Sequence, residues 1–139
     1  MSPEVVDASV VVKWLLPEEG WRKARELTDG TRDIHVPEFA LLEVDNVLCT
    51  YLRRGDLTMA EVLEARAKLT QTPLRLHPLL GLRDEAFAIA SQTGRSCHDC
   101  LYVALAMALA GRVVTADRRV FNALRETPFG AYVAWIEDV

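Results

Sequence analysis

Short runs of β-branched residues alternate with longer segments of helical periodicity along the chain, and this alternation restricts the fold more than any other feature. Residues 4–6 and 112–115 are strand-like apolar runs, and each is followed by a segment with apolar residues at helical spacing. Strands that alternate with helices form a parallel sheet that is covered by helices on both faces. The sequence therefore predicts a three-layer α/β/α sandwich with a central, mainly parallel sheet.

Local signals give the bounds of these elements. The predicted strands are residues 4–6, 34–36, 74–77, 112–115 and 131–135. The predicted helices are residues 10–16, 21–28, 39–54, 58–71, 82–93, 97–110 and 118–125. Gly55 and Gly111 are expected to end two of the helices, and Thr58 with Glu61 has the spacing of a capping box. In helix 39–54 we expect Phe39, Leu42, Val47 and Leu48 near one, apolar side.

Length and composition indicate one compact domain over residues 1–139. The chain has 139 residues, half of them apolar, and it contains no linker-like or repeated segment. Its N-terminus lacks the basic and apolar regions of a secretion signal. The longest apolar run, residues 101–110, is about half of the roughly 20 residues that a transmembrane helix needs. We therefore expect a cytoplasmic protein with no membrane segment.

Three cysteines favour neither a disulfide framework nor a zinc site. Cys97 and Cys100 form a C-x-x-C motif at a predicted helix start, where a thiol pKa is lowered, so a redox role must be weighed. The motif lies late in the chain rather than after an early strand, and no second Cys pair exists to complete a zinc site. Cys49 is expected in the core of its helix.

Four acidic residues stand where predicted elements begin or end: Asp7, Glu43, Asp99 and Asp117. Asp7 and Asp117 each follow a strand, and the carboxyl ends of parallel strands meet at one edge of the sheet. Glu43 and Asp99 are placed in the first turns of their helices. Clustered carboxylates repel one another, and a hard divalent cation is the usual reason that such a cluster is tolerated.

Each acid also has an ordinary structural interpretation. An Asp before a helix is an N-cap, and an acid in a first turn stabilises the helix dipole. Ser96 and Asp99 have the spacing of a capping box. Glu43 is different, because it stands in an apolar stretch where a carboxylate needs a partner. The prediction of one shared site therefore rests on the set of four.

The formal net charge of −4 argues at first against a nucleic-acid partner. Net charge does not exclude one, because a bound cation offsets clustered carboxylates and basic side chains can form a local positive rim. The candidates for this rim are Lys13, Arg53, Arg54, Arg112, Arg118 and Arg119. The alternative is that most of them are solvated surface residues.

Four segments in order resemble one family, the PIN-domain ribonucleases, and most closely their small single-domain toxins of the VapC type. The segments are residues 5–11, 37–48, 98–106 and 114–121, so the similarity covers nearly the whole chain. The chain departs from the family pattern at His98 and Cys100, where an aromatic and a small residue are more common. Asp45, two residues after Glu43, is an extra acid that points elsewhere on its helix.

The resemblance implies hydrolysis of RNA phosphodiester bonds with Mg²⁺ or Mn²⁺. It makes Asp7 and Asp99 the principal metal ligands, while Glu43 and Asp117 complete the acidic site directly or through water. Catalysis is then expected to depend on all four acids. Ser9 and Thr115 are expected to be supporting hydroxyls that orient ligands or contact phosphate.

The resemblance also implies a homodimer and a cognate antitoxin that covers the active site. The aromatic residues Trp14, Trp21 and Tyr51 are candidates for a groove that receives an antitoxin segment, or for ordinary core residues. Two alternatives remain open, a catalytically silent PIN-like binding module and a receiver-like signalling α/β domain. The second of these needs adjacent N-terminal acids and a late lysine, which the chain lacks.

Overall fold

A five-stranded parallel sheet forms the centre of the computed structural model, which describes residues 2–139. The strand order is β3-β2-β1-β4-β5, and every neighbouring pair is parallel. The strands are β1 (Pro3–Val6), β2 (Asp33–Pro37), β3 (Arg75–His77), β4 (Arg112–Thr115) and β5 (Val133–Trp135). The first strand therefore lies in the middle of the sheet, with β2 on one side and β4 on the other.

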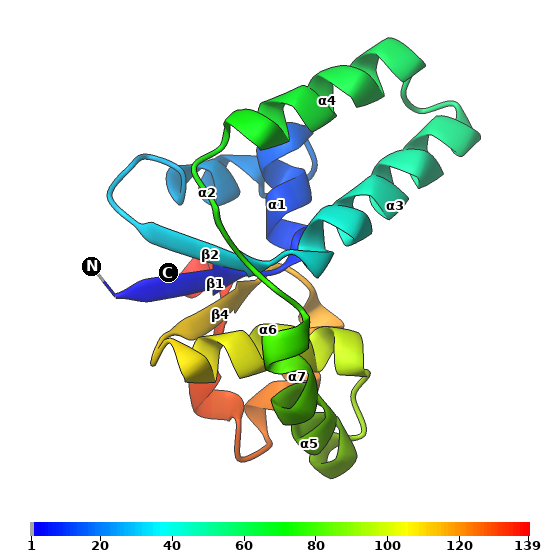
Figure 1. The fold of residues 1–139 in the computed structure, drawn as a ribbon. Coiled ribbons are helices and arrows are strands. Elements are labelled where there is room, and N and C mark those ends of the chain that lie inside the picture. The colour runs from blue at the N-terminus through cyan, green and yellow to red at the C-terminus, as the bar shows by residue number, and fades with distance from the viewer. Residues whose placement is uncertain (1) are drawn as a thin grey trace.

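Helices cover both faces of this sheet (Figure 1). They are α1 (Ala8–Leu15), α2 (Trp21–Glu26), α3 (Phe39–Arg54), α4 (Met59–Gln71), α5 (Arg83–Thr93), α6 (Cys97–Ala108) and α7 (Arg118–Arg125). Short 3₁₀ turns are η1 (Leu80–Leu82), η2 (Gly130–Tyr132) and η3 (Ile136–Asp138). In Figure 1, α1 to α4 lie on one side of the sheet and α5 to α7 on the other. The predicted three-layer α/β/α architecture is confirmed.

Burial explains the apolar runs within β1 and α6. Val5 and Val6 are fully buried because helices cover both faces of the central strand. On α6, every residue from 100 to 106 is buried, since the helix is enclosed between the sheet and α5. A helix enclosed on several sides has no need of a polar face. The longest apolar run in the sequence is therefore a core helix.

The end of α6 differs from the prediction. The helix stops at Ala108, and Ala110, rather than a glycine, takes the left-handed conformation with a φ of 53°. Gly111 has another role, because a Cβ atom at this position would lie 2.4 Å from the carbonyl oxygen of Pro3. The close approach of the chain to β1 requires the glycine there.

Two predictions about α3 are wrong, and the last strand is shorter than predicted. The buried residues of α3 are Ala40, Val44 and Leu48, a single row at i, i+4 and i+8. Leu42 lies off this row and is 56% exposed, and Cys49 is also exposed. At the C-terminus, residues 131 and 132 belong to η2, so β5 begins only at Val133. No helix within residues 2–139 is long and apolar enough to cross a bilayer.

Candidate functional site

The four acids predicted from the sequence line one small cavity of about 80 Å³. Asp7 follows β1, Glu43 lies on α3, Asp99 on α6, and Asp117 between β4 and α7. The cavity lies at the carboxyl edge of the central strands, where the connections from strand to helix in a parallel sheet leave a crevice. Several larger hollows lie elsewhere, and the two largest have mainly apolar linings. The acidic cavity is therefore distinguished by its chemistry and not by its size.

Asp7 is the most enclosed of the four acids, with 8% of its surface exposed. It caps α1 by accepting a hydrogen bond from the Val10 backbone N–H at 3.3 Å. The Ser9 hydroxyl donates to its Oδ1, and the Thr115 hydroxyl donates to its Oδ2. Both hydroxyls that the sequence predicted to be supporting residues thus orient the same carboxylate.

Asp117 begins α7 as its N-cap residue. Its Oδ1 accepts hydrogen bonds from the backbone N–H groups of Arg119 and Val120, at 3.0 and 3.4 Å. Its own N–H donates to the Thr115 hydroxyl at 3.0 Å, and the neighbouring Ala116 N–H donates to Ser9 at 3.1 Å. The two strand-to-helix junctions are thus tied together, and the structural and functional interpretations of Asp117 are compatible.

Glu43 lies in the second turn of α3, not in the first as the sequence suggested. It is partly buried, and its Oε1 accepts a hydrogen bond from the hydroxyl of Tyr102 on α6. Tyr102 is itself buried, with 4% of its surface exposed. This bond supplies the partner that a carboxylate in an apolar stretch requires.

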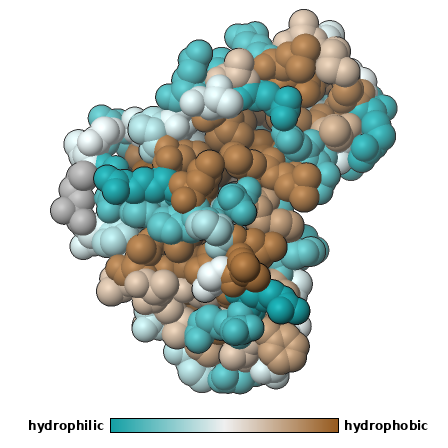
Figure 2. All heavy atoms as spheres, in the orientation of Figure 1, coloured by the Kyte–Doolittle hydropathy of each residue, from teal (hydrophilic) through white to brown (hydrophobic). Residues whose placement is uncertain are grey.

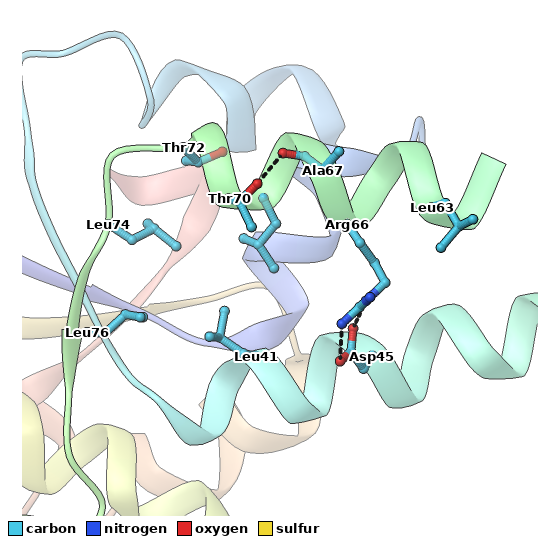
Figure 3. Close-up of a pocket in the computed structure, with 10 residues that line it drawn as sticks. Leu41, Asp45, Leu63, Arg66, Ala67, Thr70, Thr72, Leu74 and Leu76 are labelled. Carbon is cyan, nitrogen blue, oxygen red and sulfur yellow. Dashed lines mark hydrogen bonds and ion pairs between the residues drawn. The ribbon is translucent and has the colours of Figure 1, made fainter. Parts of the chain in front are cut away.

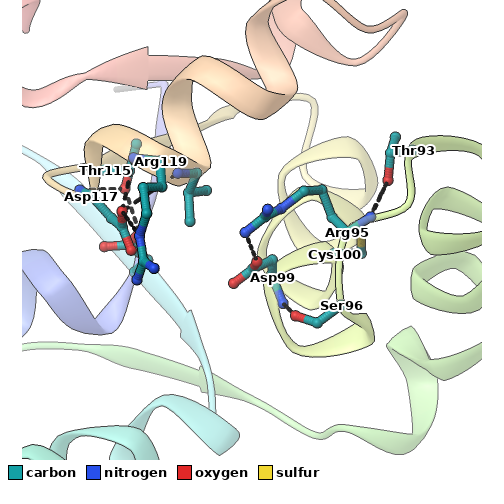
Figure 4. A network of polar contacts seen from close by, with 10 residues as sticks. Thr93, Arg95, Ser96, Asp99, Cys100, Thr115, Asp117 and Arg119 are labelled. Carbon is teal, nitrogen blue, oxygen red and sulfur yellow. Dashed lines mark hydrogen bonds and ion pairs between the residues drawn. The ribbon is translucent and has the colours of Figure 1, made fainter.

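Asp99 is held by an arginine on the preceding loop. Nη2 of Arg95 donates to its Oδ2 at 2.8 Å, and the Asp99 N–H donates to the Ser96 hydroxyl at 3.2 Å. Ser96 therefore caps α6, but the Asp99 carboxylate does not complete a capping box. Figure 4 shows Asp99 and the Arg95 guanidinium pointing toward the segment that carries Asp117 and Arg119.

Burial dominates the electrostatics of this cavity. It raises the pKa of Asp7 to about 6, although the hydrogen bonds from Ser9, Thr115 and Val10 work against the shift. Burial also raises the pKa of Glu43, where the hydrogen bond from Tyr102 opposes the shift and the charge of Asp99 adds to it. A cation bound beside these carboxyl groups would stabilise their ionised forms, which burial and mutual repulsion disfavour.

The donor set fits a hard divalent cation, since carboxylate oxygens are the preferred ligands of Mg²⁺ and Mn²⁺. The side chains are not yet arranged as a coordination shell. Among residues 2–139, no three His, Cys, Asp or Glu side chains are placed to hold a metal ion together. Asp99 faces Arg95, and Asp117 faces the N–H groups of its own helix.

The sequence predictions missed two residues of the cavity and its rim, Arg95 and Tyr102. Tyr102 had a local signal, because it lies three residues after Asp99 and residues at this spacing share a helix face. Arg95 lies on the loop before α6, so helical spacing did not predict its contact with Asp99. The contact of Tyr102 with Glu43 joins positions 59 residues apart. Its partner could not be identified without the fold.

Other sequence candidates have structural roles in this fold. Arg112 is bonded to Glu4 at the amino end of the central strands, so it does not belong to a rim around the cavity. Arg119 does lie beside Asp117, with its Nε 4.0 Å from Oδ1 of the carboxylate. Trp14 is a core residue whose indole N–H donates to the Ala24 carbonyl at 2.7 Å. Burial raises the pKa of the Cys100 thiol, which disfavours a redox role for the C-x-x-C motif.

A parallel three-layer domain with acidic side chains at the carboxyl edge of its sheet defines the class of this protein. Residues 5–126 match the PIN domain family. The chain belongs to this family, and membership sets aside the receiver-like alternative.

Named relatives match most of the chain. It is 32% identical to "Ribonuclease VapC3" of Pyrobaculum aerophilum over 118 residues, which span 84% of this chain and 90% of that protein. It is 33% identical to "Ribonuclease VapC9" of Mycobacterium tuberculosis over 116 residues, which span 84% and 87% of the two chains. The crystal structure of PAE2754 from Pyrobaculum aerophilum has the same fold, with a TM-score of 0.68 at 21% identity, covering 99% of this chain and 85% of that one.

Proposed function

We propose that this protein is a metal-dependent endoribonuclease, the toxin of a VapBC-type toxin-antitoxin pair. The observation that carries the proposal is the convergence on one cavity, in a PIN domain, of four carboxylates that are spread over more than a hundred positions of the sequence. The names of the relatives as ribonucleases supply the substrate class. The reaction is hydrolysis of an RNA phosphodiester bond, in which water adds to phosphorus and a ribose oxygen leaves.

Mg²⁺ or Mn²⁺ is the proposed cofactor, held chiefly by Asp7 and Asp99, with Glu43 and Asp117 as direct or water-mediated ligands. When bound, such an ion lowers the pKa of the attacking water and offsets negative charge on the leaving oxygen. Ser9 and Thr115 hold the Asp7 carboxylate in place through hydrogen bonds to both of its oxygens. To bind the ion, the Asp99 carboxylate must either turn away from Arg95 or contact the ion and the Arg95 guanidinium at the same time.

Cleavage of defined RNA by purified variants tests three of the four acids. We expect at least about a hundred-fold loss of Mg²⁺-dependent cleavage in each of Asp7→Asn, Asp99→Asn and Glu43→Gln. The amide side chain keeps the shape of the carboxylate but lacks the negative charge that binds the ion. Asp45→Asn is the matched control for Glu43→Gln. Asp45 lies on the same helix, but its carboxylate is bonded to Arg66 on α4 rather than facing the acidic cavity. Cleavage that survives in Asp7→Asn would overturn the assignment.

Transcript mapping then identifies the substrate. Sequencing of the RNA 5′ ends that accumulate after induction should show sites that are present with the wild type and absent with Asp7→Asn. A pocket of carboxylates binds the phosphate and not the base, so the cleavage sequence must come from this experiment.

We further infer two protein partners, a cognate antitoxin and a second copy of the chain. Exposed apolar side chains offer surfaces for them, and Figure 2 shows apolar residues gathered on this face of the molecule. One is a hollow of about 510 Å³ between α3, α4, β3 and the segment before β3, where Leu63 and Leu76 are half exposed (Figure 3). Another is a patch on η1 and α5, where Leu80 and Phe87 are 81% and 67% exposed. Apolar surface of this kind favours association.

Separate variants distinguish these two surfaces. We expect Leu63→Asp to weaken copurification with the protein encoded beside this gene, and Phe87→Asp to lower the molar mass of the free protein in light scattering. A monomeric wild type would reject the homodimer. A catalytically silent binding module is the alternative function, and it would bind RNA or a protein partner while all preparations with Mg²⁺ and Mn²⁺ leave RNA intact.

A further inference from the structure

We propose that Tyr102 is the positioning residue of the acidic site, and that its hydroxyl holds Glu43 in the orientation from which it binds the metal ion. The inference deepens the proposed function and rests on it. Tyr102 lies three residues after Asp99, so both side chains extend from the same face of α6 into the cavity. It carries no charge and is not itself a proposed ligand.

The phenol joins the two helices that carry Glu43 and Asp99. Its hydroxyl donates to Oε1 of Glu43 on α3. Ala8, the residue that follows Asp7, lines the same cavity as Tyr102. The helix that carries Tyr102 also carries Asp99. One buried side chain thus joins α3 to α6, the helices that carry Glu43 and Asp99, in a cavity that Asp7 also lines.

The direction of the bond has a consequence for Glu43. A phenol has one proton, and here it is used on one of the two carboxylate oxygens. Oε2 has no hydrogen-bond donor within the described structure, so it remains available to a ligand in the cavity. Without the phenol, no side chain in residues 2–139 holds the Glu43 carboxylate. A flexible glutamate would then lose side-chain entropy on binding an ion.

A structural role alone would not require this particular acceptor. A buried tyrosine hydroxyl needs a hydrogen-bond partner, but a backbone carbonyl serves as well as a carboxylate. Trp14, for example, satisfies its indole N–H with the Ala24 carbonyl. The partner of Tyr102 is instead a proposed metal ligand, and both residues line the same cavity.

Binding of Mn²⁺ to the full-length Tyr102→Phe protein tests the proposal. The change removes the hydroxyl and keeps the ring. Loss of a group that orients a metal ligand lowers metal affinity by about 10- to 100-fold, and we expect a loss of at least ten-fold in calorimetry or by electron paramagnetic resonance of free Mn²⁺. With RNA, kcat should fall at low Mn²⁺ and recover at high Mn²⁺, while KM for RNA stays unchanged.

Tyr51→Phe is the matched control, because Tyr51 also donates its hydroxyl to a glutamate, Glu18, away from the acidic cavity. It should leave Mn²⁺ affinity unchanged. Adding Tyr102→Phe to Glu43→Gln gives a second test that does not depend on one variant alone. If Tyr102 acts through Glu43, the double variant binds Mn²⁺ no more weakly than Glu43→Gln.

The outcomes separate this proposal from the proposed function. Unchanged Mn²⁺ affinity in a folded Tyr102→Phe, or fully additive losses in the double variant, would overturn the positioning role. If the wild type binds Mn²⁺ in a Tyr102-dependent manner but cuts no RNA, the nuclease assignment falls and the positioning role stands. A wild type that binds no Mn²⁺ overturns both.

Discussion

The hydroxyl of Thr115, the last residue of β4, donates a hydrogen bond to Oδ2 of Asp7, the residue that follows β1. The two strands are parallel neighbours, and their register pairs Val6 with Val114. The next residue of each strand therefore lies at the same edge of the sheet. Thr115 is fully buried and Asp7 nearly so, which makes the bond part of the core as well as of the site.

Burial of Asp7 makes the stability of the metal-free protein depend on pH. Its pKa is about 6 in the folded protein against 3.8 ordinarily, so the folded state binds this proton more tightly than the unfolded state does. The resulting stabilisation is complete below pH 3.8 and is lost as pH rises through about 6. Asp7→Asn removes this dependence. At pH 7.5 in EDTA, its free energy of unfolding should exceed that of the wild type by up to roughly 3 kcal/mol.

Urea unfolding of both proteins at pH 5 and pH 7.5 measures this effect. The advantage of Asp7→Asn should be clearly smaller at pH 5, where Asp7 of the wild type is mostly protonated. An equal difference at the two pH values would contradict the prediction.

Arg95 competes with a metal ion for Asp99. Arg95→Gln removes a positive charge from a 2.8 Å contact with the carboxylate, so Mn²⁺ should bind about five-fold more tightly. This factor corresponds to about 1 kcal/mol, the upper range for a partly exposed ion pair. Calorimetric titration measures it. Arg66→Gln is the control, because Arg66 makes a 2.8 Å contact with Asp45 outside the acidic cavity. Equal or weaker Mn²⁺ binding in Arg95→Gln would reject the competition.

Glu4 stabilises the fold without taking part in the site. It is 6% exposed and accepts hydrogen bonds from Arg32 at 3.1 Å and from Arg112 at 3.0 and 3.1 Å. Glu4→Gln leaves both arginines without a counter-charge and should cost about 2 kcal/mol of unfolding free energy. RNA cleavage at 20 °C should be unaffected. The exposed pair of Glu64 and Lys68 supplies the comparison, since Glu64→Gln should change stability by less than about 0.5 kcal/mol.

Gly111 is required by the approach of the chain to β1. A Cβ atom there would lie 2.4 Å from the Pro3 carbonyl oxygen, so Gly111→Ala must displace backbone at the centre of the sheet. We expect a loss of about 2 kcal/mol or more in thermal or urea unfolding. Gly81→Ala is the matched change, because nothing lies within 4 Å of its added methyl group. Similar stabilities of the two variants would show that the contact is relieved without cost.

Helix bounds and caps, which depend on signals a few residues apart, were predicted well from the sequence. The bounds of α3 and α7 match the prediction, and the capping box of Thr58 and Glu61 is present as expected. Leu42 was wrongly expected on the apolar side of α3 and Cys49 wrongly in its core, because periodicity shows that a helix has an apolar face but not which row of residues meets a neighbour. Only the packing of α3 against the body of the protein decides that.

The sequence by itself determined the alternation of strands and helices, and with it the parallel sheet. It also determined that the acidic residues that follow strands lie at the carboxyl edge of that sheet. It did so because caps, breakers and side-chain periodicity act over a few residues. Only the tertiary structure decided that Tyr102 bonds to Glu43 and that Thr115 bonds to Asp7. These contacts join residues 59 and 108 positions apart, and such distances close only when the sheet order and helix packing are set.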